Sequence, residues 1–397
     1  MLERRTLPRS LLAKVERRGI YKTIGSFVFP LRSIVECFFI RSDFFSAIKK
    51  TNGKSYTQQV LERLKIVILL RMEPTAYYSQ GFCFRTSLRV KELNEFLSRR
   101  QVVNLNTYLS ENVPLPKNIE IVSDKAKFAD FCNTNGIATP KIYLTYKPDE
   151  LFFDENLKKI NLLLDEKESI FLKPIDGYLG KGQAIILRAG NDRWDIKDNK
   201  SNHKSLARQE VLNYLENTPL IWGDRIVLQE VIKNHSALLR FGSDALFTVR
   251  LWTVKLKDDF LPVTATFKIN ESGKISDNHG QNRTVIDIDL NSGKLGKGSQ
   301  VYCGKNPILP LSVDSDVNGN VFTGMQFPFF QEMIETGLNF HRNLNDFVVL
   351  GHDIAVTENG PVMIETNMIL DCTVFQTSSG KGILSTSYLE SVLDSSH

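Results

Sequence analysis

The spacing of apolar residues along the chain changes character near residue 115. Before that point, segments such as LERLKIVILLRM and VKELNEFLSRR repeat apolar positions every three or four residues, a spacing that predicts helices. After it, short β-branched runs alternate with helical segments and with turns that contain Gly or Pro. Pro114 and Pro116 mark the change. We therefore expect a mostly helical region over residues 1–115, followed by α+β structure with mainly antiparallel sheets.

The second part of the chain divides into two predicted subdomains, residues 116–228 and 229–397. In the first, Ser123, Asp124 and Lys125 start a helix that should end at Gly136, because acidic and small polar residues are typical of helix starts and glycine of helix ends. The remaining elements are expected as strands over 141–146, 170–174, 183–189, 226–232, 246–256 and 261–269, with helices over 203–217 and 327–344.

Composition places the chain among ordinary globular proteins. Its 397 residues are 42% hydrophobic and 24% charged, enough to bury a full core. The five cysteines are odd in number, scattered and without CxxC spacing, which argues against a disulfide framework or a zinc site and favours a reducing cytoplasm. We expect neither a signal peptide nor a membrane-spanning segment.

Positive charge is concentrated in the first hundred residues. They contain 20 Lys or Arg against 8 Asp or Glu, a net charge of +12, so the remainder carries −7 of the total of +5. The solvated face of ordinary helices explains this charge most simply, and contact with an anionic membrane, a polysaccharide intermediate or a partner helix stays open. Because the basic residues match no recognisable nucleic-acid module, we expect no nucleic acid partner.

A predicted hairpin near the C-terminus, GHDIAVTENGPVMIETN, carries three oxygen-bearing side chains. A three-residue turn with Gly360 in the left-handed conformation would set Asp353 opposite Glu365, with Asn367 two residues further on the same face. A strict two-residue turn would split them between faces. Two carboxylates and an amide oxygen suit Mg²⁺ bound beside phosphates, whereas an edge hairpin with solvated acids is the alternative.

A lysine inside an apolar strand comes directly before a glycine-rich loop, in KPIDGYLGKGQ. Buried lysine needs an anionic partner, and the backbone N–H groups of Gly177, Gly180 and Gly182 can turn toward phosphate oxygens. Lys173 would supply fixed charge from below, and Lys181 lies in the loop itself. Most glycine-rich hairpins are only turns, so this motif gains weight from its neighbours.

The order of these features resembles the ATP-grasp superfamily, and most closely the sugar-transfer associated ATP-grasp proteins. The likeness covers about residues 120–385 and rests on KPIDGYLGKGQ, LQEVIKNH, FTVRLWTV, SDNHGQNR and GHDIAVTENGPVMIETN. It implies an ATP-grasp fold, in which two α+β subdomains sandwich a nucleotide. Lys268 stands where such proteins often have arginine, so charge is kept but bidentate recognition is lost.

The resemblance also implies roles for individual residues. Lys125 and Lys173 would contact phosphates beneath a lid formed by the loop with Gly177, Gly180, Lys181 and Gly182. The strand end with Gln229, Glu230 and Val231 would meet adenine, and His235 would reach the ribose unless it is an ordinary surface histidine. Asp353, Glu365 and Asn367 would hold Mg ions that bridge the phosphates.

Three cationic residues are candidates for stabilising the reaction centre. Arg250 and Lys268 lie on adjacent predicted strands and Arg283 lies in a turn-rich segment, and each could instead be a structural ion-pair partner. The chain has no GxSxG motif and no marked Cys–His pair, which disfavours covalent catalysis.

The leading functional hypothesis is an ATP- and Mg-dependent, ADP-forming carboxylate–amine ligase that acts through an acyl phosphate. An amino acid and a sugar-, peptide- or metabolite-linked partner are the expected substrates. One alternative is an ATP-grasp kinase that phosphorylates a hydroxyl. The other is a non-catalytic nucleotide-binding protein of polysaccharide assembly, which the intact lysines and metal ligands disfavour.

Overall fold

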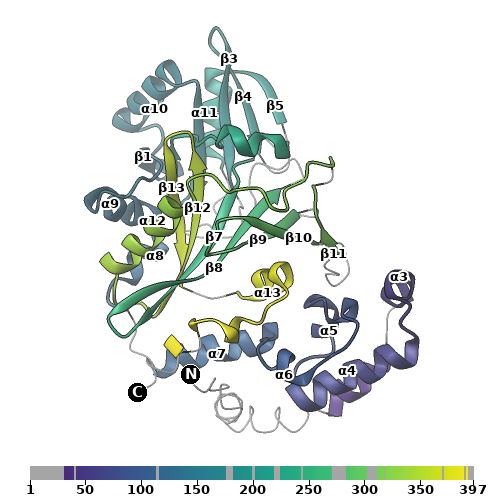
Figure 1. Cartoon of the computed structure of the whole chain (residues 1–397). Helices are drawn as coiled ribbons and strands as arrows, with labels where there is room; N and C mark the ends of the chain where they lie inside the picture. Colours follow the sequence, from purple (N-terminus) through teal and green to yellow (C-terminus); the bar gives the residue numbers. More distant parts are fainter. Residues whose placement is uncertain are drawn as a thin grey trace.

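A computed structural model describes most of the chain. The described residues are 31–39, 42–112, 116–175, 182–198, 202–218, 224–242, 245–270, 283–301, 311–316, 318–368, 371–388 and 390–391. Within them, no helix combines the length and hydrophobicity needed to cross a bilayer. The chain forms a group of N-terminal helices and two β-sheets, arranged one above another in Figure 1.

The N-terminal part is helical in the described residues, as its apolar spacing predicts. A helix over residues 31–37 comes first. The labelled elements that follow are α3 (Ser42–Asn52), α4 (Tyr56–Leu70), α5 (Ala76–Ser79), η1 (Phe82–Phe84), α6 (Val90–Leu93) and α7 (Arg99–Asn112). Helix α4 begins with a capping box. The Gln58 N–H donates to the Ser55 hydroxyl oxygen, and the Ser55 N–H donates to the side-chain Oε1 of Gln58.

The first sheet, sheet A, has the strand order β1-β6-β2-β3-β4-β5. Its strands are β1 (Ile142–Tyr146), β2 (Ser169–Pro174), β3 (Ala184–Gly190), β4 (Arg193–Asp198), β5 (Asn202–Ala207) and β6 (Ile226–Gln229). Helices α10 (Asp154–Glu166) and α11 (Arg208–Glu216) cover it, and η2 (Pro148–Glu150) follows β1. Their apolar side chains form one buried core around Trp194 and Ile196.

The second sheet, sheet B, has the order β11-β10-β9-β8-β7-β12-β13. Its strands are β7 (Thr248–Leu256), β8 (Asp259–Asn270), β9 (Arg283–Ile288), β10 (Leu295–Val301), β11 (Leu311–Val313), β12 (Val349–Thr357) and β13 (Gly360–Asn367). The helical segments around it are α8 (Ile119–Ser123), α9 (Lys125–Thr134), η3 (Ser236–Phe241), α12 (Phe330–Asn343), α13 (Thr373–Ser379) and η4 (Ile383–Ser385).

Every strand pair among the described residues is antiparallel, which confirms the expected α+β class with antiparallel sheets. Three expectations are corrected. Residues 203–207 belong to strand β5 rather than to the following helix, β4 was not expected, and β6 ends at Gln229 instead of residue 232. Pairing with neighbouring strands outweighs local helix propensity at β5.

The two faces of sheet B differ. One face is apolar and packs against α12, α8 and α9, where Phe128 and Cys132 of α9 join the core around Phe267 and Leu251. Helix α9 therefore packs on sheet B, although it precedes sheet A in the sequence. The predicted division into residues 1–115, 116–228 and 229–397 stays a prediction.

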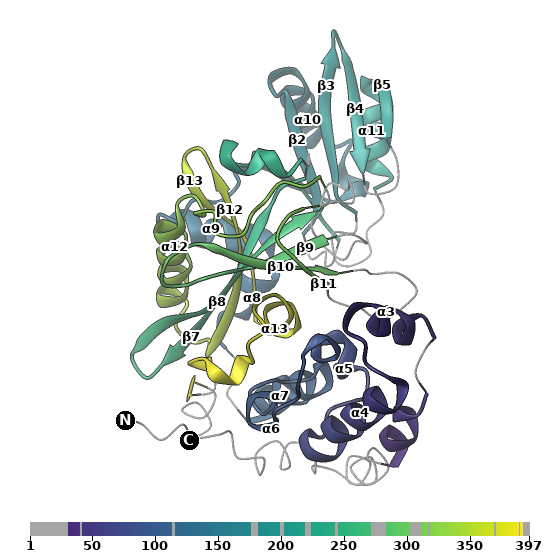
Figure 2. The same cartoon turned by 45° about the vertical axis from the view of Figure 1, so that its right-hand side comes forward.

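The other face of sheet B is shared by polar residues and by α13. Helix α13 packs against β8, β9 and β10, and in Figures 1 and 2 it lies between sheet B and the N-terminal helices. Trp252 and Val254 of β7 join Phe375 of α13 and Leu105 of α7 in a separate apolar cluster. This face is thus closed at one end and carries polar side chains at the other.

Candidate nucleotide and metal site

A row of polar residues crosses the α13-bearing face of sheet B. Glu365 of β13 is paired with Asp353 of β12, Asp353 with Arg250 of β7, and Arg250 with Thr266 of β8. Thr266 is paired in turn with Asp287 of β9. Because directly opposed residues in antiparallel strands share a face, these side chains lie side by side although up to 115 positions separate them in the sequence.

The predicted pairing of Asp353 with Glu365 is confirmed, but the expected turn is wrong. Thr357 pairs with Gly360, so the hairpin closes with a two-residue turn rather than three. Between Asp353 and Ile354 the register shifts by one residue, which leaves Ile364 as the extra residue of a β-bulge. The bulge, rather than the turn, returns Glu365 to the face of Asp353.

Asp353 is the most strongly held side chain of the row. Arg250 donates to both of its oxygens, from Nε to Oδ1 and from Nη2 to Oδ2, each at 2.7 Å. The Lys268 ammonium donates to Oδ1 at 3.1 Å. Burial acts to raise the pKa of Asp353, but the charges and hydrogen bonds of Arg250 and Lys268 prevail and hold it well below its usual range. The buried carboxylate therefore stays ionised.

Trp252 fixes the guanidinium from the side. Its ring packs directly on Gly351, where a Cβ would lie 2.6 Å from the ring, so only glycine fits. The Arg250 guanidinium lies over the same ring at 5.7 Å from its centroid. Arg250 is thus held by a carboxylate on one side and an aromatic face on the other.

Two lysines approach this row from the first sheet and from α9. Lys173 of β2 is 6% exposed. Burial and, after it, the positive charge of Lys125 lower its pKa to about 7, although the Glu365 carboxylate acts to raise it. Lys125, the first residue of α9, donates from Nζ to the Ile175 carbonyl at 2.8 Å, just after β2. Lys125, Lys173 and Glu365 influence one another's charge because they lie close together. The predicted phosphate-binding lysines therefore belong to one cluster with a predicted metal ligand.

Asp124 explains why Lys125 sits at this place. Its carboxylate caps α9 by accepting from the Ala126 and Lys127 N–H groups at 2.8 and 3.1 Å. Its second oxygen accepts from Arg225 at 2.9 Å. The predicted helix start over Ser123, Asp124 and Lys125 is confirmed, with Asp124 as the cap that anchors it beside the end of sheet A.

The pKa of Glu365 is shifted in the opposite direction from that of Asp353. Burial raises its pKa, and the negative charge of Asp353 raises it further, while Lys125, Arg250 and Lys173 act to lower it. The net direction is upward. A divalent cation between Glu365 and Asp353 would remove the repulsion between them and favour ionised Glu365.

Asn367 supplies a separate test of the metal prediction. Its side-chain Nδ2 is buried and has no hydrogen-bond partner among the described residues. Because amide N and O atoms are assigned by their partners, this orphaned position also fits an oxygen turned toward a cation. No three His, Cys, Asp or Glu side chains of the described ranges could hold a metal by themselves. Asp353, Glu365 and Asn367 form a hard oxygen set that fits Mg²⁺ if phosphate and water oxygens complete it.

Several predicted residues lie wholly or partly outside the described residues. Gly177, Gly180 and Lys181 fall there, as does the side chain of Arg283, whose backbone begins β9 opposite Asn270. Gly182 is described and has a φ of +72°, in the left-handed region that suits glycine at the end of such a loop. The lid assignment therefore stays a prediction.

The predicted adenine-binding segment lies at the end of β6. Gln229 is 5% exposed and pairs with Ile142 of β1 and Phe171 of β2. The Glu230 N–H donates to the Lys141 carbonyl at 2.9 Å, which ties this strand end to β1. Val231 follows in an irregular segment. Contact of these residues with adenine stays a prediction.

His235 has structural partners at the tip of the β12–β13 hairpin, which carries the predicted metal ligands. Its N–H donates to the Val356 carbonyl at 2.8 Å, and its ring Nδ1 accepts from the Ala237 N–H at 3.1 Å at the start of η3. Its Nε2 lies 3.6 Å from a carboxylate oxygen of Glu358. These contacts give the ring a capping role, and its place beside the ribose stays a prediction.

A buried chain of hydrogen bonds beneath the site was not predicted. The His341 Nε2–H donates to the Phe347 carbonyl at 2.9 Å, so Nδ1 accepts from the Thr253 hydroxyl at 2.8 Å. Thr253 then accepts from His352 Nε2 at 2.9 Å, and His352 Nδ1 accepts from Thr366 at 3.0 Å. Thr366 lies between Glu365 and Asn367. The chain thus joins α12, β7, β12 and β13 on the helix-covered face.

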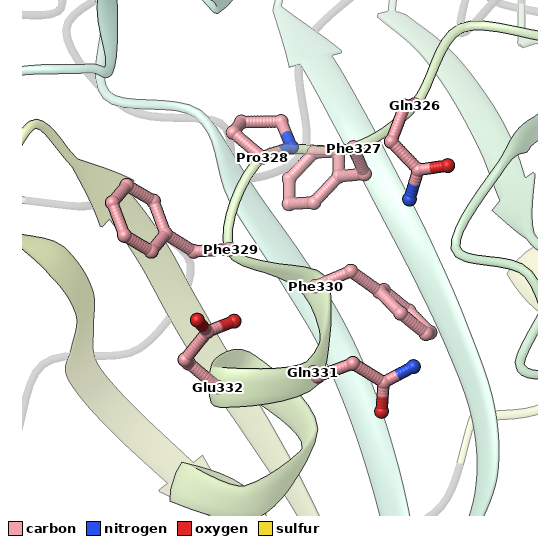
Figure 3. A pocket seen from close by; sticks show the side chains of 7 residues that line it. All are labelled: Gln326, Phe327, Pro328, Phe329, Phe330, Gln331 and Glu332. Atoms are coloured by element: carbon pink, nitrogen blue, oxygen red, sulfur yellow. The ribbon is translucent and has the colours of Figure 1, made fainter.

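A shallow pocket of about 350 Å³ lies at the N-terminus of α12. Figure 3 shows its lining, Gln326, Phe327, Pro328, Phe329, Phe330, Gln331 and Glu332. Phe330 belongs to the apolar core on the helix-covered face of sheet B, opposite the polar row. None of the predicted site residues lines this pocket, and we assign it no role in the site.

A comparison with family models identifies the family of the chain. The family model for sugar-transfer associated ATP-grasp proteins matches residues 104–392, well over half of the chain. The chain belongs to this family. The predicted family is therefore confirmed, and with it the ATP-grasp fold, preceded here by the helical N-terminal region.

Several solved structures resemble the chain at low similarity. VanG D-Ala:D-Ser ligase from Enterococcus faecalis is 13% identical with a TM-score of 0.42, covering 69% of this chain and 62% of that chain. D-alanine–D-alanine ligase from Bacillus anthracis is 13% identical with a TM-score of 0.37, covering 70% and 67%. Biotin carboxylase from Campylobacter jejuni is 11% identical with a TM-score of 0.41, covering 77% and 53%. The chain thus spans about half to two thirds of these structures, and no curated protein matches it.

Proposed function

We propose that this ATP-grasp protein is an ATP- and Mg-dependent, ADP-forming carboxylate–amine ligase that acts through an acyl phosphate. The observation that carries the proposal is the charge arrangement: the charges of buried Lys173 and half-buried Lys125 act on Glu365, while Arg250 and Lys268 bind Asp353 beside it. Cations and metal-binding oxygens in one cluster suit phosphoryl transfer, which needs positioning and charge neutralisation rather than a nucleophilic side chain.

In this proposal, residues at different places in the site have different roles. Lys125 and Lys173 bind ATP phosphates, and Asp353, Glu365 and Asn367 hold Mg²⁺. When bound, Mg²⁺ neutralises phosphate charge and orients the transferred group. A substrate carboxylate attacks the γ-phosphorus, ADP leaves, and Arg250, Lys268 and Arg283 stabilise the acyl phosphate and the tetrahedral intermediate that the amine forms from it.

The expected partners are small molecules, an amino acid and a sugar-, peptide- or metabolite-linked acceptor. A cytoplasmic location is part of the proposal, supported by Cys37, Cys83, Cys132 and Cys372, which are buried free thiols among the described residues. Contact of the basic N-terminal region with an anionic membrane or a polysaccharide intermediate remains a prediction.

The metal assignment is tested by Glu365→Gln. We expect Mg-dependent release of ADP from ATP to fall about 100-fold or more, because the amide cannot replace the anionic ligand. The measurement is steady-state ADP release across a Mg²⁺ titration, with thermal unfolding as a check of the fold. Glu335→Gln, on the exposed side of α12, is the matched control. Full activity of Glu365→Gln would refute the metal site.

Reaction type is tested with hydroxylamine as a trap. Incubation of the protein with MgATP, a pool of carboxylic acids and hydroxylamine should yield a hydroxamate, since hydroxylamine attacks acyl phosphates directly. A stable phosphorylated alcohol formed from a pool of alcohols would instead assign a kinase. Absence of both products with intact nucleotide binding would leave the non-catalytic alternative.

A further inference from the structure

The polar row on sheet B continues beyond the residues that are proposed to bind ATP and Mg²⁺. Asp287 of β9 ends it, paired with Thr266, which is paired with Arg250. At a strand spacing of about 4.8 Å, the Asp287 backbone lies about 10 Å from that of Arg250. A carboxylate of a substrate over Arg250 and a second group over Asp287 would therefore be neighbours within one small molecule's length.

Two buried hydroxyl groups flank this end of the row. Thr264, two residues from Thr266 on β8, and Ser299, opposite Val285 on β10, are 1% and 2% exposed. Their hydroxyl oxygens have no hydrogen-bond partner among the described residues. A buried hydroxyl without a partner costs about 1–3 kcal/mol, so this end of the row has hydrogen-bonding capacity that the described residues do not use.

The surroundings of Asp287 combine burial with opposite charges. Burial raises the pKa of Asp287 to about 7, Lys381 after α13 acts to lower it, and Asp289 raises it. Across the bulge in β10 stands Lys297, which lies 3.5 Å from Asp314. Helix α13, which covers this end, carries no charged side chain of its own. A carboxylate so placed is able to exchange a proton near neutral pH.

We propose that Asp287 binds the ammonium group of the amine substrate and removes its proton before attack on the acyl phosphate. This inference rests on the proposed ligase function and assigns the second substrate site to the β8–β9–β10 end of the row. The acceptor is a primary amine. Arg250 and Asp287 thus hold the two reacting partners on opposite sides of Thr266.

The proton and electron balance is complete within these groups. The ammonium gives one proton to the Asp287 carboxylate, and the nitrogen lone pair forms the C–N bond at the acyl carbonyl carbon. The C–O bond to phosphate then breaks, and phosphate leaves with the bonding pair. The remaining surplus proton passes from nitrogen to phosphate, and Asp287 returns its proton to solvent.

The experiment compares two nucleophiles on Asp287→Asn. Wild-type protein is first incubated with MgATP, hydroxylamine and each of a set of amino acids and uronic acids. The acid that yields a hydroxamate is selected as the carboxylate substrate. With that acid, amino acid amides and amino sugars are then tested as acceptors. Hydroxylamine is largely uncharged above about pH 7 and needs no base, so Asp287→Asn should keep hydroxamate formation and lose amide formation about 100-fold or more.

Controls separate this inference from the proposed function. Asp258→Asn, in the exposed turn between β7 and β8, should keep both reactions, and Asp287→Ser gives the same split if the Asn variant does not fold. The acidic limb of the amide-forming pH profile should disappear in Asp287→Asn. Equal loss of both products, or loss of neither, overturns the role of Asp287. A wild-type protein that forms no hydroxamate with any acid overturns the ligase proposal and this inference with it.

Discussion

At the scale of single residues, Asp353 has two roles, one predicted and one observed. It is a predicted metal ligand, and in the structure it also receives three hydrogen bonds from Arg250 and Lys268. Removing the Asp353 carboxylate would leave the buried Lys268 ammonium and the partly exposed Arg250 guanidinium without this counter-charge, which would destabilise the fold. Asp353 thus organises the cationic residues whether or not a metal is bound, and Glu365 is the cleaner position at which to test the metal.

Lys173 gives a prediction about pH. Its pKa lies at about 7 instead of 10.5, and phosphate oxygens beside it would raise that pKa because they favour the ammonium form. Above pH 7 the Lys173 side chain of the free protein has lost its proton, whereas in the ATP complex it is protonated. ATP binding should therefore be accompanied by the uptake of up to one proton from solvent. ATP affinity should therefore fall as pH rises above about 7, by up to tenfold per pH unit.

Calorimetric titration of ATP in buffers of different ionisation enthalpy measures this proton uptake. Lys173→Met should weaken ATP binding and abolish the uptake. Lys147→Met is the matched control, because Lys147 lies on the surface of the same subdomain and pairs with Asp224 at 3.0 Å. Unchanged ATP affinity in Lys173→Met would show that this lysine does not contact the nucleotide.

At the scale of elements, the β12–β13 hairpin shows what a local pattern can and cannot predict. The alternation of residues and the turn formers predicted the hairpin and the pairing of Asp353 with Glu365, and both are confirmed. The β-bulge at Ile364 was missed, because a bulge depends on how β12 pairs with both β7 and β13 and has no composition of its own. The right pairing was thus reached through the wrong turn.

The buried hydrogen-bond chain gives a prediction about stability. Burial lowers the pKa of His341 to about 4 from its ordinary 6.5. Between these values the unfolded chain binds the proton and the folded protein does not, so this histidine makes stability fall as pH falls from 6.5 to 4. The slope from one such group is about 1.4 kcal/mol per pH unit. His341→Phe should lose this slope together with its hydrogen bonds.

Urea unfolding at several pH values measures the effect as the pH dependence of the free energy of unfolding. His203→Asn is the control, since His203 lies on the exposed edge strand β5 and its removal should leave the slope unchanged. An unaltered slope in His341→Phe would mean that other groups cause the acid sensitivity.

At the scale of the whole molecule, one buried glutamine joins the two ends of the chain. Gln376 of α13 accepts from the Leu97 N–H at 2.9 Å and from the Ile383 N–H at 3.2 Å. Its Nε2 donates to the Leu97 carbonyl at 2.8 Å and to the Gln80 side chain at 3.1 Å. The N-terminal helices are thereby fixed to α13, which in turn covers the proposed amine site on sheet B.

Gln376→Ala should loosen this attachment. The substitution leaves several buried polar groups unpaired at about 1–3 kcal/mol each, so the N-terminal helices should become sensitive to protease under native conditions. Limited proteolysis followed by mass spectrometry locates the cuts. Gln209→Ala, on the exposed face of α11, should keep wild-type resistance. Equal resistance of both variants would show that other contacts suffice to hold the helices.

The sequence alone determined the elements whose signals are local. The helix start at Asp124, the strand before the glycine-rich loop, the β12–β13 hairpin and the helical N-terminal part follow from residue spacing and turn chemistry. The ordered motifs also carried the family likeness that the family comparison confirmed. What these elements have in common is that neighbours in sequence decide them.

Only the tertiary structure decided which distant residues meet. The register of β9, β8, β7, β12 and β13 brings Asp287 into line with Arg250, Asp353 and Glu365, and no sequence pattern marked Asp287 as part of that row. The pKa values of Lys173 and Asp287 likewise depend on burial by other parts of the chain. Strand register and desolvation are collective properties of the packed sheets, so they arise only once the whole chain has folded.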